Sequence, residues 1–392
     1  MPNRRLRIMQ IFNRYQEYGG EEGSVFRIGD ALQRIHDVEY FLSSTAEMTS
    51  GGLFRNLMMP WMALHNPEVL RKLKRYQNLG RFDAWQIHNI FPVMSPVVYE
   101  RALDWKIPIV HFLHNYRFGC VNGFFLNHGK PCQRCISGNF WAAFTTACWH
   151  DSHAKSGWMG MITAHVRKMP LFEKVFQWIA ISEAQKQVHI QMGIPEENIR
   201  VIHHFLESDA PPLARSNSST AIFVGRLSAE KGVDKLIEAW RLIAGGEREL
   251  LIVGDGPERV RLEKQALGLK GIRFTGFTQR NAQQRYWQSA LFSVVPSIWL
   301  EPFGMTVLEA WSKGRPVIGH NIGALPELIQ DNVSGLLTDP HQVSNLAEKM
   351  DCLFSNPEKA HAMGYAGYDH LKTKFSLKVW LSQMIKLYDG LR

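Results

Sequence analysis

Residues 221–232 read Ala-Ile-Phe-Val-Gly-Arg-Leu-Ser-Ala-Glu-Lys-Gly, and this stretch decides the fold class. The apolar run 221–224 predicts a strand that is buried on both faces, as in a parallel sheet. Apolar residues then recur at helical spacing over 233–243, and two glycines, Gly245 and Gly246, end that helix. A buried strand, a short loop and a covering helix make up the repeating unit of a parallel α/β sheet.

The same alternation continues along the second half of the chain and, less regularly, along the first. Single helices between strands imply right-handed crossovers and a parallel sheet that is covered on both faces. In the second half we expect strands at 221–224, 250–253, 272–275, 291–295 and 316–318, and helices at 233–243, 258–267, 282–289 and 306–312. In the first half we expect strands at 6–11, 38–42, 84–87, 108–113, 175–181 and 199–202, and a helix at 25–35.

The chain is therefore expected to hold two doubly wound, Rossmann-like α/β domains. The Pro- and Ser-rich stretch 210–220 has the composition of a linker. We place the N-terminal domain at 1–205, the C-terminal domain at 206–374, and at 375–392 a last helix that packs back across the domain junction. Because open sheets bind ligands at the carboxyl ends of their strands, the expected site is the cleft between the two domains.

Length and composition exclude several classes of protein. The 392 residues, 45% of them hydrophobic and 21% charged, are enough for two or three globular domains. No run approaches the roughly 20 apolar residues of a membrane-spanning helix, and the apolar run behind the basic start is too short for a secretory signal. Five cysteines are few and odd in number, which fits a reducing compartment. We expect a cytoplasmic protein.

Positive charge is concentrated in the first half of the chain. Residues 1–205 carry 23 basic and 16 acidic side chains, a net charge of +7, whereas the remainder carries 22 and 20, a net charge of +2. This imbalance indicates an anionic partner or surface for the first half. No nucleic-acid recognition module is evident, so nucleic acid is not an expected partner.

Four loops of the second half follow strands and carry unusual residues. The first, 225–232, places Arg226 and Lys231 just before a helix N-terminus, where free amides and the helix dipole attract anions. This pattern predicts a diphosphate site, and the alternative is two solvated loop charges. The glycine-rich loop 253–257 could be a simple chain reversal. In loop 274–277 the backbone could approach a flat base.

The fourth loop, 296–310, reads Pro-Ser-Ile-Trp-Leu-Glu-Pro-Phe-Gly-Met-Thr-Val-Leu-Glu-Ala. Glu301 precedes the expected helix, and Glu309 lies inside it, eight positions on. A rise of about 1.5 Å per residue separates them by roughly 12 Å, about the span from a donor sugar across a diphosphate to a ribose. Gly304 would let a phosphate approach the first helical amides. The alternative is a capping Glu301 and a surface Glu309.

These four motifs, in this order, resemble the signature of retaining nucleotide-sugar glycosyltransferases of the GT-B fold, family 4 (glycosyl transferases group 1). The resemblance covers about the second half of the chain. It implies two Rossmann-like domains that face each other across a cleft, with the acceptor bound by the N-terminal one. It also implies retaining transfer of a sugar, without a divalent metal, from a UDP- or GDP-type donor to a hydroxyl of a glycan or lipid-linked acceptor, in bacterial cell-surface polysaccharide or glycolipid synthesis.

The resemblance assigns roles to individual residues of the second half. It implies that Arg226 and Lys231 bind the donor diphosphate and that Glu309 binds the ribose hydroxyls. Glu301 would bind the donor sugar beside the reacting carbon. Further donor contacts are expected at Gly225, Gly276, Phe303, Gly304 and Met305.

In the first half, Gly19 and Gly20 look like the glycine-rich loop that such enzymes set beneath the donor phosphates. The family usually has a small or apolar residue after the two glycines, whereas here Glu21 and Glu22 follow and have no assigned role.

His114 ends the strand expected at 108–113 and corresponds to the histidine of the family's His-Asp step, with Asn115 in place of the Asp. It could donate a hydrogen bond to sugar or phosphate, and we count it with Arg226, Lys231 and Glu301 as the catalytic set. His88-Asn89 could line the same cleft.

Cys120, Cys132, Cys135 and Cys148 lie within 29 residues, spaced Cys-x11-Cys-x2-Cys-x12-Cys. This spacing is compatible with a tetrahedral structural zinc, and the alternatives are small buried residues or a redox pair. The surrounding residues, about 117–160, also resemble an insertion found in a subgroup of these transferases. In either case we assign the cluster to folding, with no cofactor for catalysis.

Two regions suit the surface of an anionic membrane, which leaves open a peripheral association with its inner face. The apolar stretch 53–62 is followed by the basic run 71–75. A second region is aromatic and contains Phe140, Trp141, Phe144, Trp149 and Trp158. Core packing beneath a solvated basic face is the alternative.

Two other functions stay open at this point. One is another GT-B enzyme, such as a nucleotide-sugar 2-epimerase, which would need carboxylates arranged for proton abstraction. The other is a binding protein for an anionic ligand without enzymatic activity.

Overall fold

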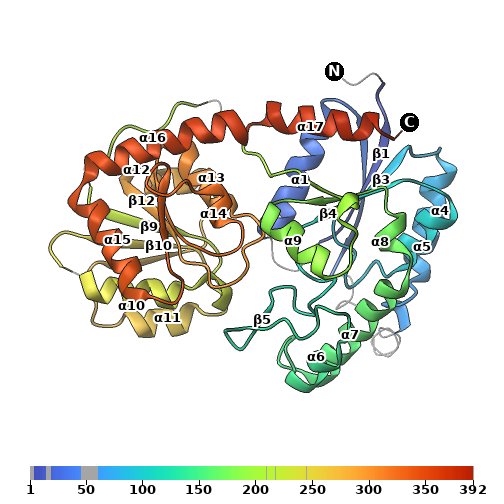
Figure 1. The fold of residues 1–392 in the computed structure, drawn as a ribbon, viewed down its shortest axis with the longest axis horizontal. Helices are drawn as coiled ribbons and strands as arrows, with labels where there is room; N and C mark the ends of the chain where they lie inside the picture. Colours follow the sequence, from blue (N-terminus) through green and yellow to red (C-terminus); the bar gives the residue numbers. More distant parts are fainter. Residues whose placement is uncertain are drawn as a thin grey trace. The chain divides into compact units, whose positions relative to one another are not determined.

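The structure is a computed structural model that describes residues 4–14, 19–45, 61–208, 210–216, 218–243 and 245–391 (Figure 1). The chain forms two compact units. The N-terminal unit comprises Met1–His203 and Trp380–Arg392, and the C-terminal unit comprises His204–Val379. Each unit is built on one parallel sheet, which confirms the predicted fold class.

The sheet of the N-terminal unit has six strands in the order β2-β1-β3-β4-β7-β8, and all neighbours pair in parallel. The strands are β1 (Arg7–Arg14), β2 (Asp37–Ser44), β3 (Ala84–Ile87), β4 (Ile109–Leu113), β7 (Gln177–Ala180) and β8 (Ile199–Val201). A separate antiparallel ribbon lies in the cysteine-containing segment and consists of β5 (Leu126–Asn127) and β6 (Lys130–Pro131).

Helices connect these strands. Helix α4 illustrates their start signals, because the side chain of Asn66 accepts hydrogen bonds from the amides of Glu68 and Val69, and Pro67 stands at the first position. The helices of this unit are α1 (Gly20–Gln33), α4 (Pro67–Asn78), α5 (Val97–Asp104), α6 (Trp141–Thr146), α7 (His153–Lys168), α8 (Leu171–Lys174), α9 (Glu183–Gln191) and the 3-10 turn η1 (Glu196–Asn198).

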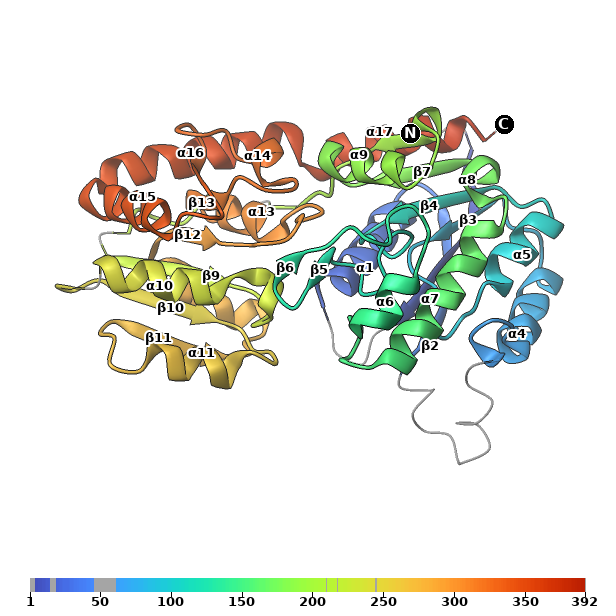
Figure 2. The ribbon, with the colours of Figure 1, turned by 60° about the horizontal axis from the view of Figure 1, so that its bottom comes forward.

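The sheet of the C-terminal unit also has six parallel strands, in the order β11-β10-β9-β12-β13-β14. In Figure 2, strands β13, β12, β9, β10 and β11 lie one above another in this order. The strands are β9 (Thr220–Val224), β10 (Glu249–Val253), β11 (Ile272–Gly276), β12 (Ala290–Val295), β13 (Val317–His320) and β14 (Gly335–Thr338). The helices are η2 (Ala229–Lys231), α10 (Val233–Ile243), α11 (Arg259–Ala266), η3 (Arg280–Gln283), α12 (Gln284–Ser289), α13 (Met305–Ser312), α14 (Leu325–Leu328), α15 (Val343–Ser355) and α16 (Pro357–Lys374).

The core of the C-terminal unit explains why residues 221–224 are apolar throughout. Every residue of β9 and of its neighbour β12 is buried, as expected for central strands of a parallel sheet. Trp240 of α10 is completely buried, and Phe354 of α15 packs on Phe292 of β12 with 4.8 Å between ring centroids. Apolar residues of α10 and α15 therefore form one hydrophobic core with β9 and β12.

Helix α17 (Leu377–Asp389) begins in the C-terminal unit, and its residues from Trp380 onward belong to the N-terminal unit. Within the latter, the Tyr388 hydroxyl donates to Oε1 of Gln86 in β3 (2.7 Å), and its ring meets His36 edge to face at 5.1 Å. The last helix, red in Figure 1, therefore contributes to the interior of the N-terminal unit.

Three of the buried histidines of the N-terminal unit have strongly lowered pKa values, because water cannot stabilise a charge on them. Burial lowers the pKa of His111 and of His114 to about 3, and that of His189 to about 4. All three rings are therefore neutral at pH 7.

We expect the N-terminal unit to lose stability as the pH falls from about 6.5 toward 4. The unfolded histidines take up protons near pH 6.5, whereas the folded ones stay neutral, so acid favours the unfolded chain by up to about 1.4 kcal/mol per pH unit for each histidine. Urea titrations at pH 7, 6 and 5 measure this slope. The His189→Gln variant should show a slope smaller by about one proton, and an unchanged slope would contradict the assignment.

Candidate functional site

Three loops at the carboxyl ends of β9, β10 and β11 are joined by backbone hydrogen bonds. The amide of Gly225 donates to the carbonyl of Val253 (3.0 Å). The amide of Leu227 donates to the carbonyl oxygen of Asp255 (2.8 Å), and the amide of Gly254 donates to the carbonyl oxygen of Gly276 (3.1 Å). The loops predicted to bind a donor therefore form one continuous rim on the C-terminal unit.

Glycines allow the loops of this rim to approach so closely. A Cβ at Gly254 would lie 1.8 Å from the carbonyl oxygen of Gly225. Gly232 has a φ of +65°, and a Cβ there would lie 2.0 Å from the carbonyl oxygen of Pro296. Because no side chain fits at these positions, the loop 296–304 also packs directly on the first loop.

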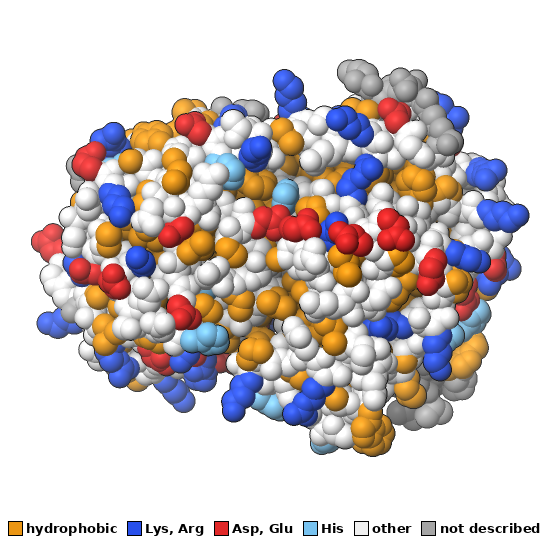
Figure 3. All heavy atoms as spheres, in the orientation of Figure 1, with side chains coloured by type: hydrophobic (Ala, Val, Ile, Leu, Met, Phe, Trp, Pro, Cys, Tyr) orange, Lys and Arg blue, Asp and Glu red, His pale blue; other side chains and the backbone are white. Residues whose placement is uncertain are grey.

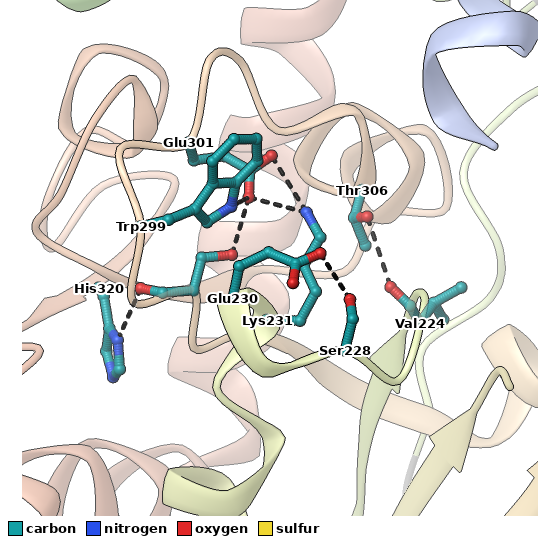
Figure 4. A network of polar contacts seen from close by, with 9 residues as sticks. Val224, Ser228, Glu230, Lys231, Trp299, Glu301, Thr306 and His320 are labelled. Carbon is teal, nitrogen blue, oxygen red and sulfur yellow. Dashed lines mark hydrogen bonds and ion pairs between the residues drawn. The ribbon is translucent and has the colours of Figure 1, made fainter. Parts of the chain in front are cut away.

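The carboxylate of Glu301 is the centre of a polar network in the C-terminal unit (Figure 4). Lys231 Nζ lies 2.9 Å and 3.2 Å from its two oxygens. The hydroxyl of Ser297 and the indole N–H of Trp299 donate to Oε2 at 2.8 Å and 2.9 Å. Glu301 is only 7% exposed, so these charge-assisted bonds hold the carboxylate in one orientation.

The two predicted phosphate-binding cations both lie on the loop 225–232. The ammonium group of Lys231 has three N–H donors, and two of them suffice for Glu301, so the third can bind an anion. The side chain of Arg226 is exposed. The geometry suits an anionic ligand that lies against this loop.

Helix α13 begins directly after Gly304, one residue before the predicted start at 306. Gly304 has a φ of +105°, a conformation that favours glycine, and Met305 is the first helical residue. The N-terminal end of a helix carries partial positive charge, which makes this end suitable for phosphate. Glu309 lies inside the helix and is half-buried.

Phe303 is buried rather than turned toward a ligand. Its ring packs edge to face on His204 and Phe375, with centroid distances of 5.3 Å and 6.0 Å. A donor would therefore have to meet the backbone of Phe303, not its ring.

On the N-terminal unit, the glycine pair stands at the start of α1. Gly19 is the N-cap, and Gly20 is the first helical residue, so the helix begins five residues before the predicted start at 25. No described atom lies within 4 Å of the place that a Cβ would take at either glycine.

The two acids after the glycines both have partners. Glu22 is 1% exposed and pairs with Arg14 of β1 at 2.7 Å. Oε2 of Glu21 accepts a hydrogen bond from Nδ2 of Asn115 at 3.1 Å. An aspartate at position 115 would place two negative charges side by side. Glu21 and Asn115 both depart from the family pattern, and the hydrogen bond between them makes the two departures compatible.

His114 follows β4 directly, at the carboxyl end of the strand. Its Nε2 lies 2.7 Å from Nδ1 of His88, and the two rings stack with 5.0 Å between centroids. His88, Asn89, His111 and His114 line a small cavity at the carboxyl ends of β3 and β4. The structure thus brings together the histidines that the sequence assigned to neighbouring strand ends.

Two family models match this chain in succession. The model described as "Glycosyltransferase Family 4" matches residues 18–209, and the model described as "Glycosyl transferases group 1" matches residues 205–370. Together they cover most of both units. The chain belongs to the family 4 glycosyltransferases.

The relatives of this chain include enzymes with different substrates. The alpha-D-kanosaminyltransferase of Streptomyces kanamyceticus is 30% identical over 173 residues, which cover 43% of this chain and 44% of that protein. The glycogen synthase of Mycobacterium tuberculosis is 24% identical over 352 residues, 86% of this chain and 76% of that protein. The chain spans less than half the length of the kanosaminyltransferase that it matches.

Solved structures share the fold over the whole chain. Sucrose-phosphate synthase from Thermosynechococcus elongatus has a TM-score of 0.74 at 19% identity and covers 99% of both chains. The Anabaena protein HepE, in complex with UDP and glucose, has a TM-score of 0.71 at 18% identity and covers 98% of this chain and 100% of its own. At such identities the likeness shows the GT-B fold alone, as predicted.

The four cysteines of the predicted insertion line a second small cavity, and none of them forms a disulfide. Burial raises the pKa of the Cys135 thiol to about 12, and it also raises the pKa of Cys120 and of Cys148. Among the described residues, no group of three or more His, Cys, Asp or Glu side chains is arranged to hold a metal ion. The zinc site stays a prediction from the spacing.

The segments predicted to contact a membrane differ in exposure. Residues 53–60 lie outside the described residues. The basic run 71–75 lies on α4, whose cationic side chains are exposed while Val69 and Leu73 are buried, which is the solvated face of an amphipathic helix. None of the helices in the described part of the chain is long and apolar enough to cross a membrane.

The aromatic region is divided between the interior and the surface. Phe140 is buried, Trp149 and Trp158 are half-buried, and Trp141 and Phe144 are 68% and 38% exposed.

Sequence reasoning missed the two residues that orient Glu301. Ser297 and Trp299 were part of the motif but received no role, although a hydroxyl and an indole N–H close to an acid are obvious donors for it. The partnership of Glu21 with Asn115 was also missed, because 94 positions separate the two residues.

Replacing Lys231 with Met should destabilise the C-terminal unit, because Glu301 would keep its buried charge without a cation. Removing one partner of a buried ion pair costs about 3–5 kcal/mol, and the partial exposure of Lys231 reduces this to roughly 1–3 kcal/mol. Urea denaturation measures the loss. The double variant with Glu301→Gln should regain most of the lost stability, because the glutamine amide carries no charge. A double variant as unstable as Lys231→Met would refute this explanation.

Proposed function

We propose that this glycosyltransferase transfers a sugar from a nucleoside-diphosphate sugar to a hydroxyl of a glycan or lipid-linked acceptor, with retention at the anomeric carbon. The observation that carries the proposal is the ion pair of Lys231 and Glu301 on the loop rim. It holds a cation suited to a departing phosphate beside a carboxylate suited to sugar hydroxyls. Synthesis of a bacterial cell-surface polysaccharide or glycolipid is the proposed context.

The donor in this proposal lies along the rim of the C-terminal unit. Arg226, the third N–H of Lys231 and the first amides of α13 bind the diphosphate. Glu309 accepts hydrogen bonds from the ribose hydroxyls, and Glu301 accepts them from the sugar. HepE, which has the same fold, is solved with UDP and glucose, and this supports a uridine donor over a guanosine one.

The proposed reaction breaks the bond between the anomeric carbon and the diphosphate oxygen. The acceptor oxygen bonds to the same face of that carbon, and its proton passes to the departing phosphate oxygen. Negative charge grows on the diphosphate, so fixed cations and amides aimed at it are the main catalytic contribution. These groups belong to the chain itself, and we propose that activity persists in EDTA. His114 donates a hydrogen bond to the sugar or phosphate.

Arg226→Ala should lower kcat for release of nucleoside diphosphate on the order of 100-fold, because a donor to the developing charge is lost. Release is measured with UDP- and GDP-sugars, with and without acceptor, after thermal-shift screening of UDP and GDP. Arg241→Ala is the matched control, since this exposed arginine lies at the far end of α10. Equal rates in both variants would refute the role of Arg226, and an absence of any donor binding would refute the proposed function.

We also propose that the surface around α6 and α7 contacts an anionic membrane. Trp141 and Phe144 are exposed and stack with 5.1 Å between ring centroids, and Met161 is 62% exposed. Residues 117–168 carry six basic side chains and one acidic side chain. Figure 3 shows basic and apolar side chains next to one another along the lower edge of the N-terminal unit. Aromatic side chains beside net positive charge suit an anionic lipid surface.

Replacing Trp141 and Phe144 with Ser should reduce co-sedimentation with vesicles that contain acidic lipid, because the apolar contacts of both side chains with the lipid are lost. Phe277→Ser is the matched control, since this aromatic residue of the C-terminal unit is as exposed as Trp141. Binding of the wild type should fall as salt rises. Equal binding to neutral and acidic vesicles would contradict the membrane assignment. So would a Trp141/Phe144 variant that binds acidic vesicles as well as the Phe277 variant does.

A further inference from the structure

A chain of hydrogen bonds links helix α17 to His114 through the N-terminal unit. The hydroxyl of Tyr388 donates to Oε1 of Gln86 (2.7 Å), and Nε2 of Gln86 lies 3.0 Å from Oε1 of Gln10. The same Nε2 lies 3.1 Å from Nε2 of His88, whose Nδ1 lies 2.7 Å from Nε2 of His114. All five side chains are buried, and His114 is the most exposed at 9%.

A backbone carbonyl sets the direction of these bonds. Nε2 of Gln10 lies 2.8 Å from the carbonyl oxygen of Val25, which can only accept. Oε1 of Gln10 is therefore the acceptor that faces Gln86. Gln86 must turn its amide nitrogen toward Gln10, and its own Oε1 then accepts from Tyr388.

The amide nitrogen of Gln86 decides where both histidines carry their protons. Because this nitrogen can only donate, Nε2 of His88 must be an unprotonated acceptor. His88 is then neutral, carries its proton on Nδ1 and donates to Nε2 of His114. A neutral imidazole has a single N–H, so the proton of His114 lies on Nδ1. Burial, which lowers the pKa of His114 to about 3, keeps this ring neutral.

We propose that Gln86, His88 and Tyr388 are positioning residues that hold His114 in its Nδ1–H form, so that Nδ1 is the atom that donates to the donor sugar or its phosphate. The opposite tautomer would turn a lone pair toward ligand oxygens and repel them. The use of Nδ1 in catalysis rests on the proposed function, whereas the tautomer itself does not.

Long-range proton–nitrogen NMR correlation of the full-length protein tests the tautomer directly. The spectra distinguish Nδ1–H from Nε2–H rings, and His88→Gln and His114→Gln spectra assign the signals. We expect both histidines in the Nδ1–H form at pH 7. A proton on Nε2 of His114 would overturn the proposal, whether or not the protein transfers sugar.

Gln86→Met tests the positioning role, because it removes the amide that fixes His88. We expect His114 to populate both tautomers and kcat to fall by up to about tenfold, the value of one hydrogen bond, with a smaller change in the donor KM. A single unchanged tautomer at His114 would overturn the proposal.

Tyr388→Phe removes only one hydroxyl, and it tests the same positioning role if the Gln86→Met variant does not fold. Its matched control is Tyr99→Phe, since the equally buried hydroxyl of Tyr99 bonds to His111 and not to the chain that ends at His114. Tyr388→Phe should lower kcat more than the control does, at equal stability loss. Equal effects on kcat would mean that the hydroxyl of Tyr388 acts only in packing, and would overturn its role.

Discussion

The bond network around Glu301 is the constraint on which the C-terminal unit depends. A carboxylate removed from water costs several kcal/mol unless donors replace its hydration. Lys231, Ser297 and Trp299 supply them from two different loops. Both loops must therefore keep their conformation for the Glu301 carboxylate to retain its hydrogen-bond donors. A ligand that meets this carboxylate finds it already oriented, so little reorganisation is needed on binding.

Backbone contacts between the loops give this constraint its geometry. Gly225, Gly232 and Gly254 stand where loops from different strands meet, and a single extra carbon at the last two would collide with a carbonyl oxygen. Glycine is required at those two positions by space as well as by φ. The rim is consequently stiff where the proposed diphosphate would lie.

The fold and the C-terminal loops could be predicted because their signals are local. Strand periodicity and glycine-rich turns identified β9 to β13 and the position of Gly304 before α13. Strand β14 and helices α15 and α16 were not among the predicted elements, since the motif-bearing alternation ends before them. Contacts such as Glu21 with Asn115, or Gln86 with Tyr388 across 302 positions, leave no periodic trace in a single sequence. Such contacts between distant positions are therefore found only from the three-dimensional structure.

The division of the chain into units has a consequence for its synthesis. The C-terminal unit is one continuous stretch, but the N-terminal unit needs residues from Trp380 onward, including Tyr388 in its interior. A ribosome makes those residues after the whole C-terminal unit. The N-terminal unit therefore cannot complete its core until the C-terminal unit has been made, and part of its interior stays exposed during that synthesis.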